Sequence, residues 1–309
     1  MSHDPGDRHA ASPSPPVNPG VVLALAIVGI SVAAPLVRLS QAPAVVVALW
    51  RLGFSLVLVG AALLLSGQWR EWRTLRSSEL SLATIAGVAL AGHFWSWNAS
   101  VHLTTIAASV TLVCLQPAII VAISAAYLHE SPTRTQLAGI AIALGGALTI
   151  TLPDLLRAAP GGSGPPNPLL GNLLALLGAL LASIYYVIGR RVRARLGIWS
   201  YVGIAYTACF AALFVAAVVT RVSIVPQPSR ELLIFAGLAL GPMLLGHTGM
   251  NWALRYRPAY VVNLTVLAEP LGASLIAAAL PVIAETPPAT TIAGGAIVLT
   301  GLALASARR

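Results

Sequence analysis

Two polar residues of this chain lie inside long apolar stretches, and each is followed directly by proline. Glu269 precedes Pro270 near the middle of its stretch. Gln116 precedes Pro117 at the equivalent depth of an earlier one. Proline has no backbone N–H and frees a carbonyl one turn earlier. Each pair therefore joins a polar side chain to a weakened helix, which suits binding of a polar solute or transfer of a proton.

A single cation also lies within an apolar stretch, at Arg51. An ionisable side chain in hydrocarbon costs from about 2.5 kcal/mol upward, so such groups usually face a cavity or a partner. Two roles for Glu269 stay open on this basis. It contacts a substrate or a proton, or it forms a structural charge pair with Arg51.

The remaining candidates are polar or aromatic residues at the ends of apolar stretches or deep within them. They are His93, Trp97 and Asn98 in HFWSWN, His247 and Asn251 in HTGMNW, and Tyr185. Imidazole can exchange a proton near physiological pH, although a neutral histidine bonded to a carbonyl fits equally well. The asparagines can bind a solute or satisfy the turns that follow them. Tyr185 can line a cavity or simply pack.

The composition places these residues in a membrane. Apolar residues make up 57% of the 309 residues, whereas charged residues make up 9%. A soluble domain typically carries about 25% charged residues, so lipid must cover most of this surface. The arginines are scattered, which argues against a nucleic-acid partner. Cys114 and Cys209 lie in apolar stretches and are expected to pack, and no cofactor or metal site is predicted.

A helix needs about 20 apolar residues to cross a bilayer, and ten stretches qualify. They are 20–37, 43–65, 80–97, 103–128, 136–152, 169–189, 199–220, 232–252, 258–281 and 288–306. We therefore predict an all-α integral membrane protein with about ten transmembrane helices. Its predicted parts are a disordered cytoplasmic tail, a five-helix repeat, a Pro/Gly-rich linker and a second five-helix repeat, at 1–19, 20–152, 153–168 and 169–306.

The arginines indicate how the helices are oriented. With a cytoplasmic N-terminus, 13 of the 18 arginines fall on the inner side, four on the outer side and Arg51 inside a helix. Positive residues favour the cytoplasmic side, so both termini are predicted to be cytoplasmic. Five helices per half is an odd number, so the second half is inverted relative to the first.

The two halves share sequence at matching places. A displacement of 153 residues pairs Asn98 with Asn251, Gln116 with Glu269, and Pro117 with Pro270. A displacement of 155 pairs Glu130 with Glu285. Inverted repeats are a recurrent plan of secondary transporters, whose halves exchange conformations around a central site. The chain carries no ATP-binding or hydrolase motif, so a gradient is expected to drive any transport.

These motifs resemble the EamA-type transporters of the drug/metabolite transporter superfamily. The resemblance rests on APAVVVALWR, HFWSWNASVHLTTIAASVTLVCLQP, LHESPTRTQLAG and GHTGMNWALRYRPAYVVNLTVLAEPLGASLIAAAL, and covers about 20–306. It implies ten helices in inverted halves, cytoplasmic termini, and a cavity bordered by helices 1, 3, 4, 6, 8 and 9. Members move amino acids and other small metabolites or drugs, mostly outward.

We therefore expect a secondary transporter in a bacterial inner membrane, most simply an exporter of small amphipathic metabolites that works by alternating access with proton coupling at Glu269. Its expected partners are a small-molecule substrate and the lipid bilayer, with a monomer or a homodimer as the assembly. An importer or exchanger of the same fold is one alternative. A membrane-embedded enzyme or a passive channel is another, although an enzyme would need a clustered catalytic set that this sequence lacks.

Overall fold

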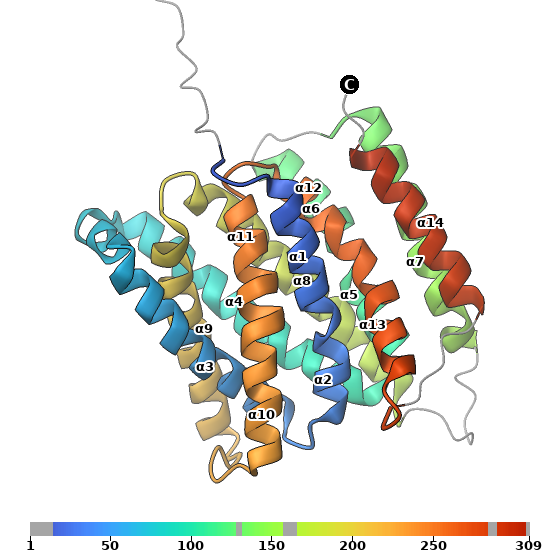
Figure 1. The fold of residues 1–309 in the computed structure, drawn as a ribbon, viewed down its shortest axis with the longest axis horizontal. Coiled ribbons are helices and arrows are strands. Elements are labelled where there is room, and N and C mark those ends of the chain that lie inside the picture. The colour runs from blue at the N-terminus through green and yellow to red at the C-terminus, as the bar shows by residue number, and fades with distance from the viewer. Residues whose placement is uncertain (1–14, 128–131, 157–165, 284–288, 307–309) are drawn as a thin grey trace, which may run out of the picture.

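The apolar stretches become helices, coloured from blue to red along the chain in Figure 1. In this computed structural model the described residues are 15–127, 132–156, 166–283 and 289–306, and these contain no strand. The predicted match of Glu130 with Glu285, together with most of the predicted tail and linker, lies outside these ranges.

The described helices of the first half group into five spans, two of them interrupted. In order, they are α1 (Pro19–Ser31) with α2 (Ala33–Leu39); α3 (Ala44–Leu65); α4 (Ser77–Leu103); α5 (Ile106–Val113) with α6 (Gln116–Tyr127); and α7 (Arg134–Leu156). A short 3-10 helix, η1 (Gln68–Thr74), connects the second span to the third.

The described helices of the second half also group into five spans. They are α8 (Pro168–Arg193); α9 (Ile198–Val219); α10 (Ser229–Leu238) with the π-helical η2 (Ala239–Thr248) and α11 (Gly249–Ala253); α12 (Ala259–Leu264) with the 3-10 helix η3 (Thr265–Ala268) and α13 (Glu269–Ala279); and α14 (Ala289–Ser306). Spans four and nine are therefore broken at corresponding places.

Length and surface chemistry confirm the predicted membrane fold. Seven helical stretches of 21 to 27 residues within the described ranges have the length and hydropathy to cross a bilayer. Large apolar side chains face outward from them: Val57, Leu65, Val219 and Leu233 are each more than two-thirds exposed. Such a surface is stable only where lipid replaces water. The protein is an all-α membrane protein built as two five-span repeats.

Each repeat begins with the same capped turn. Asn18 and Asn167 precede Pro19 and Pro168, the first residues of α1 and α8. The Asn18 side chain accepts a hydrogen bond from the backbone N–H of Gly20 at 2.8 Å, and that of Asn167 accepts from Leu170 at 3.2 Å. An Asn cap followed by proline is a strong helix start, so local sequence fixes where both repeats enter the membrane.

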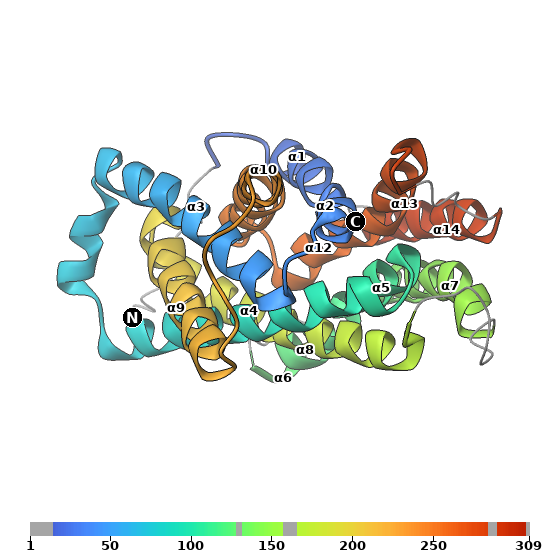
Figure 2. The same ribbon diagram turned by 90° about the horizontal axis from the view of Figure 1, so that it is seen from below.

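The most extensive packing joins the two halves to each other. Helix α4 packs along α8 and α9, α3 packs along α9, α1 packs against η2, and α7 packs along α14. Figure 2 shows α4 and α8 running together beneath the layer that contains α1 and α10. The halves are thus interleaved, and the centre of the molecule lies between them.

Small residues bring α7 and α14 into close contact. A Cβ added at Gly139 would lie 2.6 Å from the Ala305 nitrogen, and one added at Gly146 would lie 2.7 Å from the Gly294 carbonyl oxygen. Glycine faces let membrane helices approach this closely, because no side chain separates the backbones. This pair lies side by side at the right-hand side of the bundle in Figure 1.

Candidate functional site

A cavity lies between the two halves, with residues from seven of the ten spans on its wall. Its volume is about 30 Å³. A site needs roughly 10–15 Å³ of such volume for one water molecule, so the cavity is narrow in this conformation. Its polar and aromatic lining residues are Arg51, His93, Trp97, Gln116, Tyr186, His247 and Glu269.

The two polar residues singled out by their following prolines both begin a half-helix. Gln116 is the first residue of α6, and Glu269 is the first residue of α13. Pro117 and Pro270 follow them as second residues, where a missing N–H does little harm. Each half-helix thus begins one residue before its proline, and the interruption of the span lies just before that start, at 114–115 in span four and at η3 in span nine.

The two broken spans contact each other across the cavity wall. The Cys114 thiol, which lies in the break of span four, donates to the Val266 carbonyl oxygen at 3.3 Å. That carbonyl is the one that Pro270 frees, because it lies four residues earlier. The same thiol lies 3.9 Å from Oε2 of Glu269. The hydrogen bond from Cys114 therefore replaces the backbone hydrogen bond that Pro270 cannot donate to the Val266 carbonyl oxygen. This contact places Glu269 where the two halves meet.

Arg51 is 1% exposed, and its guanidinium stacks over the Phe94 ring at 4.0 Å from the centroid. None of its three side-chain nitrogens has a hydrogen-bond partner among the residues that the structure describes. The direct charge pair with Glu269, one of the two roles open for that residue, is therefore not formed, although both side chains line the same cavity. A buried guanidinium is stable here only through the aromatic face and the field of more distant groups.

The two predicted histidines, one from each half, meet at the cavity with their ring centroids 6.0 Å apart. Nδ1 of His93 lies 2.9 Å from the Gly178 carbonyl oxygen. That oxygen can only accept, so Nδ1 carries the hydrogen. Nδ1 of His247 lies 3.0 Å from the Tyr186 hydroxyl. His247 belongs to η2, where Pro242 interrupts the regular ladder, and π-helical turns of this kind often occur at functional sites.

Trp97 lines the cavity as well, but three predicted site residues do not. The Nδ2 of Asn98 donates to the Ala44 carbonyl at 3.2 Å, which fixes the start of α3. The Nδ2 of Asn251 donates to the Tyr185 hydroxyl at 2.6 Å and to the His247 carbonyl at 2.7 Å. These side chains form a buried support behind the lining.

Tyr186 lines the cavity where Tyr185 was expected. Adjacent residues of a helix point about 100° apart, so only one of the two can face a given cavity. The Tyr186 hydroxyl contacts His247 and lies 3.4 Å from the Met250 sulfur. The rotation of α8 against α4 decides which of these two adjacent tyrosines lines the cavity.

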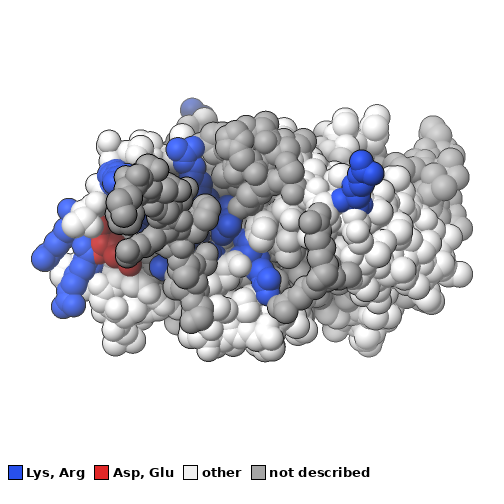
Figure 3. Space-filling view, turned by 90° about the horizontal axis from the view of Figure 1, so that it is seen from above, with Lys and Arg blue, Asp and Glu red and all other residues white. Residues whose placement is uncertain are grey.

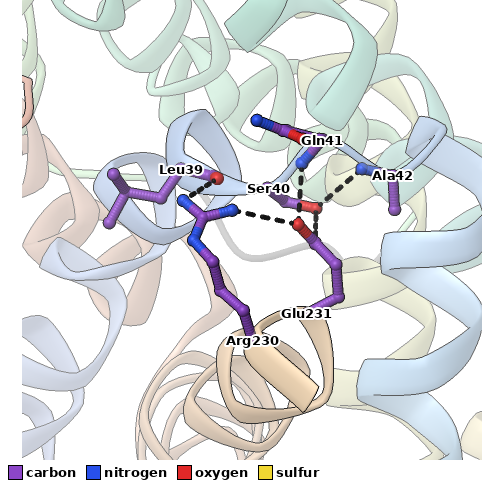
Figure 4. Close-up of polar contacts among 6 residues, drawn as sticks. All are labelled: Leu39, Ser40, Gln41, Ala42, Arg230 and Glu231. Carbon is purple, nitrogen blue, oxygen red and sulfur yellow. Dashed lines mark hydrogen bonds and ion pairs between the residues drawn. The ribbon is translucent and has the colours of Figure 1, made fainter. Parts of the chain in front are cut away.

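At one end of the molecule, a buried carboxylate that sequence analysis missed ties two spans together. Glu231, in the first turn of α10, accepts hydrogen bonds from the Ser40 hydroxyl at 2.5 Å and the Gln41 backbone N–H at 3.0 Å. Arg230 lies 3.2 Å from the same carboxylate and donates to the Leu39 carbonyl oxygen at 2.7 Å. Figure 4 shows these contacts joining the loop after α2 to the start of α10.

At the opposite end of the molecule, an equivalent carboxylate also ties two spans together. Glu79, in the first turn of α4, lies 2.5 Å from Arg195 and accepts from the Arg76 backbone N–H at 3.0 Å. Arg195 lies in the turn after α8, as Ser40 lies in the loop after α2. This end also carries the cluster of arginines visible in Figure 3.

A sequence signal for both carboxylates exists. Ser-Ser-Glu-Leu (77–80) and Ser-Arg-Glu-Leu (229–232) match at a displacement of 152.

Arginines close the helix ends next to these carboxylates. Arg38 donates to the Val101 carbonyl at 2.6 Å and to the Thr104 carbonyl at 2.8 Å, at the end of α4. Arg193 donates to the Asn251 carbonyl at 3.0 Å, in α11. Cations at helix C-termini satisfy the last carbonyls and complement the helix dipole. Each arginine ties the end of the first span of its half to the end of the third.

Among the residues that the structure describes, no three His, Cys, Asp or Glu side chains lie close enough together to hold a metal ion. Cys114 and Cys209 are both buried free thiols.

Comparisons with known proteins agree with this architecture. A family model described as the EamA-like transporter family matches residues 18–152 and again residues 169–307. A solved structure described as "Crystal structure of protein" superposes with a TM-score of 0.69 at 23% sequence identity. The match covers 93% of this chain and 96% of that one, which shows the same fold. No curated protein matches this chain.

Proposed function

The chain belongs to the EamA-like transporter family, and from this premise we propose that it exports small amphipathic metabolites, such as amino acids, by alternating access. Membership of the family makes it a multi-pass membrane transporter of the drug/metabolite type. The substrate class, the outward direction and the coupling to protons are the proposal. Among the residues that support it are Gln116, Glu269, His93, His247, Trp97 and Arg51, which line one cavity.

One observation carries the proposal: a narrow polar cavity lies where two broken helices of the inverted halves meet. In transporters with inverted repeats, discontinuous helices at the repeat interface form the substrate site, and rocking of the halves opens it alternately to each side. Here Glu79 and Glu231 hold the two ends of the bundle by equivalent contacts. A passive channel would instead need a continuous path between the two faces.

Proton coupling is proposed at Glu269. Its side chain is 7% exposed and begins a half-helix at the cavity. A carboxylate in this position can take up a proton when the cavity opens to one side and release it when the cavity opens to the other. A buried acid inside a membrane is otherwise costly, so a role in coupling explains why the chain carries one here.

The orientation is proposed from charge. The turn after α3, together with the end of α8 and the turn that follows it, carries seven of the 14 described arginines, and Figure 3 shows the face on which such cations gather. Helix α1 begins, and α14 ends, at this same end of the bundle in Figure 1. By the positive-inside rule this face is cytoplasmic, so both termini lie in the cytoplasm of a cell with an inner membrane.

The test is a profile of metabolites released by cells that over-express the protein. Cells grown on isotope-labelled carbon are compared for the wild type, Glu269→Ala, Gln116→Ala and Trp95→Ala at matched membrane levels. Trp95 is 46% exposed on the outside of α4 and serves as the control. We expect one group of small metabolites to rise outside wild-type and Trp95→Ala cells only. Accumulation inside the cells would show import, and identical profiles for all four would refute transport through this cavity.

A further inference from the structure

The least explained group in the cavity is the guanidinium of Arg51. It is 1% exposed, and none of its three nitrogens has a hydrogen-bond partner. Buried charges are normally paired, because an unpaired one loses its hydration without compensation. One face of the guanidinium lies on Phe94, and this contact leaves the edge that carries the N–H groups free. The N–H groups of the guanidinium are thus desolvated, and no described protein group accepts a hydrogen bond from them.

A second donor on the cavity wall is also unused. The Trp97 indole nitrogen has no hydrogen-bond partner, and the side chain is 4% exposed. Trp97 follows Phe94 by three residues on α4, so the two side chains share one face of that helix. A guanidinium edge and an indole N–H on one wall are both donors, and neither can satisfy the other. They require a ligand that accepts hydrogen bonds.

The complementary groups come from the two broken spans. The Gln116 side-chain oxygen is a buried acceptor without a partner, and Glu269 supplies a carboxylate. The rest of the lining is apolar, including Ile30, Val113 and Met250. The cavity therefore offers donors on the α3 and α4 side, acceptors at the starts of α6 and α13, and aliphatic surface between them.

We propose that Arg51 is the carboxylate-binding residue of this transporter. Its planar fork pairs with the carboxylate of the solute, Trp97 adds a donor, and the acceptors of Gln116 and Glu269 accommodate the amino group, while the aliphatic part of the solute lies against the apolar lining. Arginine suits this role because its fork matches a carboxylate with two parallel hydrogen bonds. The inference rests on the proposed function, since it assigns the chemical class that the same cavity admits.

The test compares three probes that share one aliphatic skeleton. L-Leucine carries both a carboxylate and an amino group, 4-methylpentanoate lacks the amino group, and 3-methylbutylamine lacks the carboxylate. Binding is measured from the thermal stabilisation of the purified full-length protein over a concentration series. We expect the wild type to bind leucine and 4-methylpentanoate but not the amine. Arg51→Gln should weaken leucine binding about tenfold or more, as expected for loss of a charge-assisted pair.

Four controls separate recognition from folding. Arg73→Gln removes an exposed cation far from the cavity and should leave leucine binding unchanged. Arg51→Lys keeps the charge without the fork and should bind with intermediate affinity. Trp97→Phe keeps an aromatic ring without the N–H and tests the site should Arg51→Gln fail to fold. Without ligand, Arg51→Gln should melt no lower than the wild type, because it removes an unpaired buried charge.

Several outcomes would overturn the assignment. They are equal binding of the amine and leucine, or undiminished leucine binding by Arg51→Gln. If that variant does not fold, undiminished leucine binding by Trp97→Phe overturns the assignment instead. Absence of stabilisation by all three probes would also overturn it. Transport itself would still stand in that case if the released metabolites continued to depend on Glu269, so failure of the two proposals can be told apart.

Discussion

At the scale of single residues, the cavity combines groups that a membrane interior normally excludes. Arg51 and Glu269 line the same space without a direct bond, and two histidines lie with their rings 6.0 Å apart beside them. The buried Arg51 guanidinium, which has no hydrogen-bond partner among the described residues, lowers the free energy of unfolding. The pattern is typical of a site that trades stability for binding, since function often requires groups that do not suit the fold.

Glu269→Gln should abolish the dependence of transport on a pH gradient while expression is maintained. Glutamine keeps the shape of the side chain but cannot release a proton, so it imitates a permanently protonated acid. The measurement is solute flux in proteoliposomes with and without an imposed gradient, using a metabolite identified in the release assay. If the variant responds to pH as the wild type does, Glu269 does not couple protons.

Asn251→Ala should destabilise the protein and leave specificity unchanged. Its amide bridges the Tyr185 hydroxyl and the His247 carbonyl while fully buried. Removing one partner from buried hydrogen bonds costs about 1–3 kcal/mol. We expect a lower melting temperature with the same order of preference among the three probes. A changed order of preference would place Asn251 in the binding site instead.

At the scale of elements, the two ends of the bundle are held by matched contacts. Glu231 binds the loop after α2, and Glu79 binds the turn after α8, each from the first turn of the third span of its half. The two carboxylates lie at opposite ends of the molecule because the halves are inverted. Contacts that are equivalent by sequence thus become separate closures for the two sides of the membrane.

The native thiol Cys114 reports these closures, because its sulfur contacts the cavity-lining residues Val266 and Glu269. In a Cys209→Ala background it is the single cysteine of the chain. We expect Glu231→Gln to speed labelling of Cys114 by a membrane-impermeant thiosulfonate applied from the Ser40 side, and Glu79→Gln to speed it from the Arg195 side. Loss of a hydrogen bond to the buried Glu231 carboxylate, about 1.5–3 kcal/mol, corresponds to tenfold or more. The effect of Glu79→Gln should be smaller, because its partner Arg195 is half exposed.

Oriented vesicles of both kinds provide the measurement, and the unsubstituted Cys209→Ala protein is the reference. Faster labelling from both sides in either variant would indicate general loosening of the fold and would reject a closure specific to one face.

At the scale of the whole molecule, neither half is a packing unit. The principal helix pairs, including α4 with α8 and α7 with α14, join one half to the other. Polar groups from both halves line one cavity, as where Arg51 of α3 shares it with Glu269 of α13. The site therefore exists only after the two repeats have come together.

A chain divided between 157 and 165 should consequently need both pieces to fold. Each half expressed alone should be degraded, because the glycine face of α7 and much of the surface of α4 would be exposed. Co-expression should restore a complex that survives detergent extraction. Fluorescence of a fused reporter in size-exclusion chromatography measures this. A stable, monodisperse single half would contradict the interleaved arrangement.

Reporter fusions test the orientation of the complete protein. Fusions at the N- and C-termini should both show cytoplasmic activity, because ten spans return the chain to its starting side. A periplasmic C-terminus would refute the count of ten spans. Two periplasmic termini would show that the arginine-rich face is periplasmic and not cytoplasmic.

The sequence by itself determined the membrane class, the ten apolar spans, the duplication, and the two broken helices at Gln116 and Glu269. These properties follow from composition, from the length needed to cross hydrocarbon, and from the local effect of proline, all of which act within one stretch of chain. It also indicated His93, His247, Trp97 and Arg51 as candidates, because polar groups in apolar runs are rare.

Only the tertiary structure decided which candidates share a cavity. It selected Tyr186 over Tyr185 through the rotation of α8, placed Asn98 and Asn251 behind the lining, and left Arg51 over Phe94 without an anion. It also revealed Glu79 and Glu231 as matched closures. Such choices depend on helix rotation and on contacts between residues far apart in the chain, and hydrophobic periodicity carries no information about either.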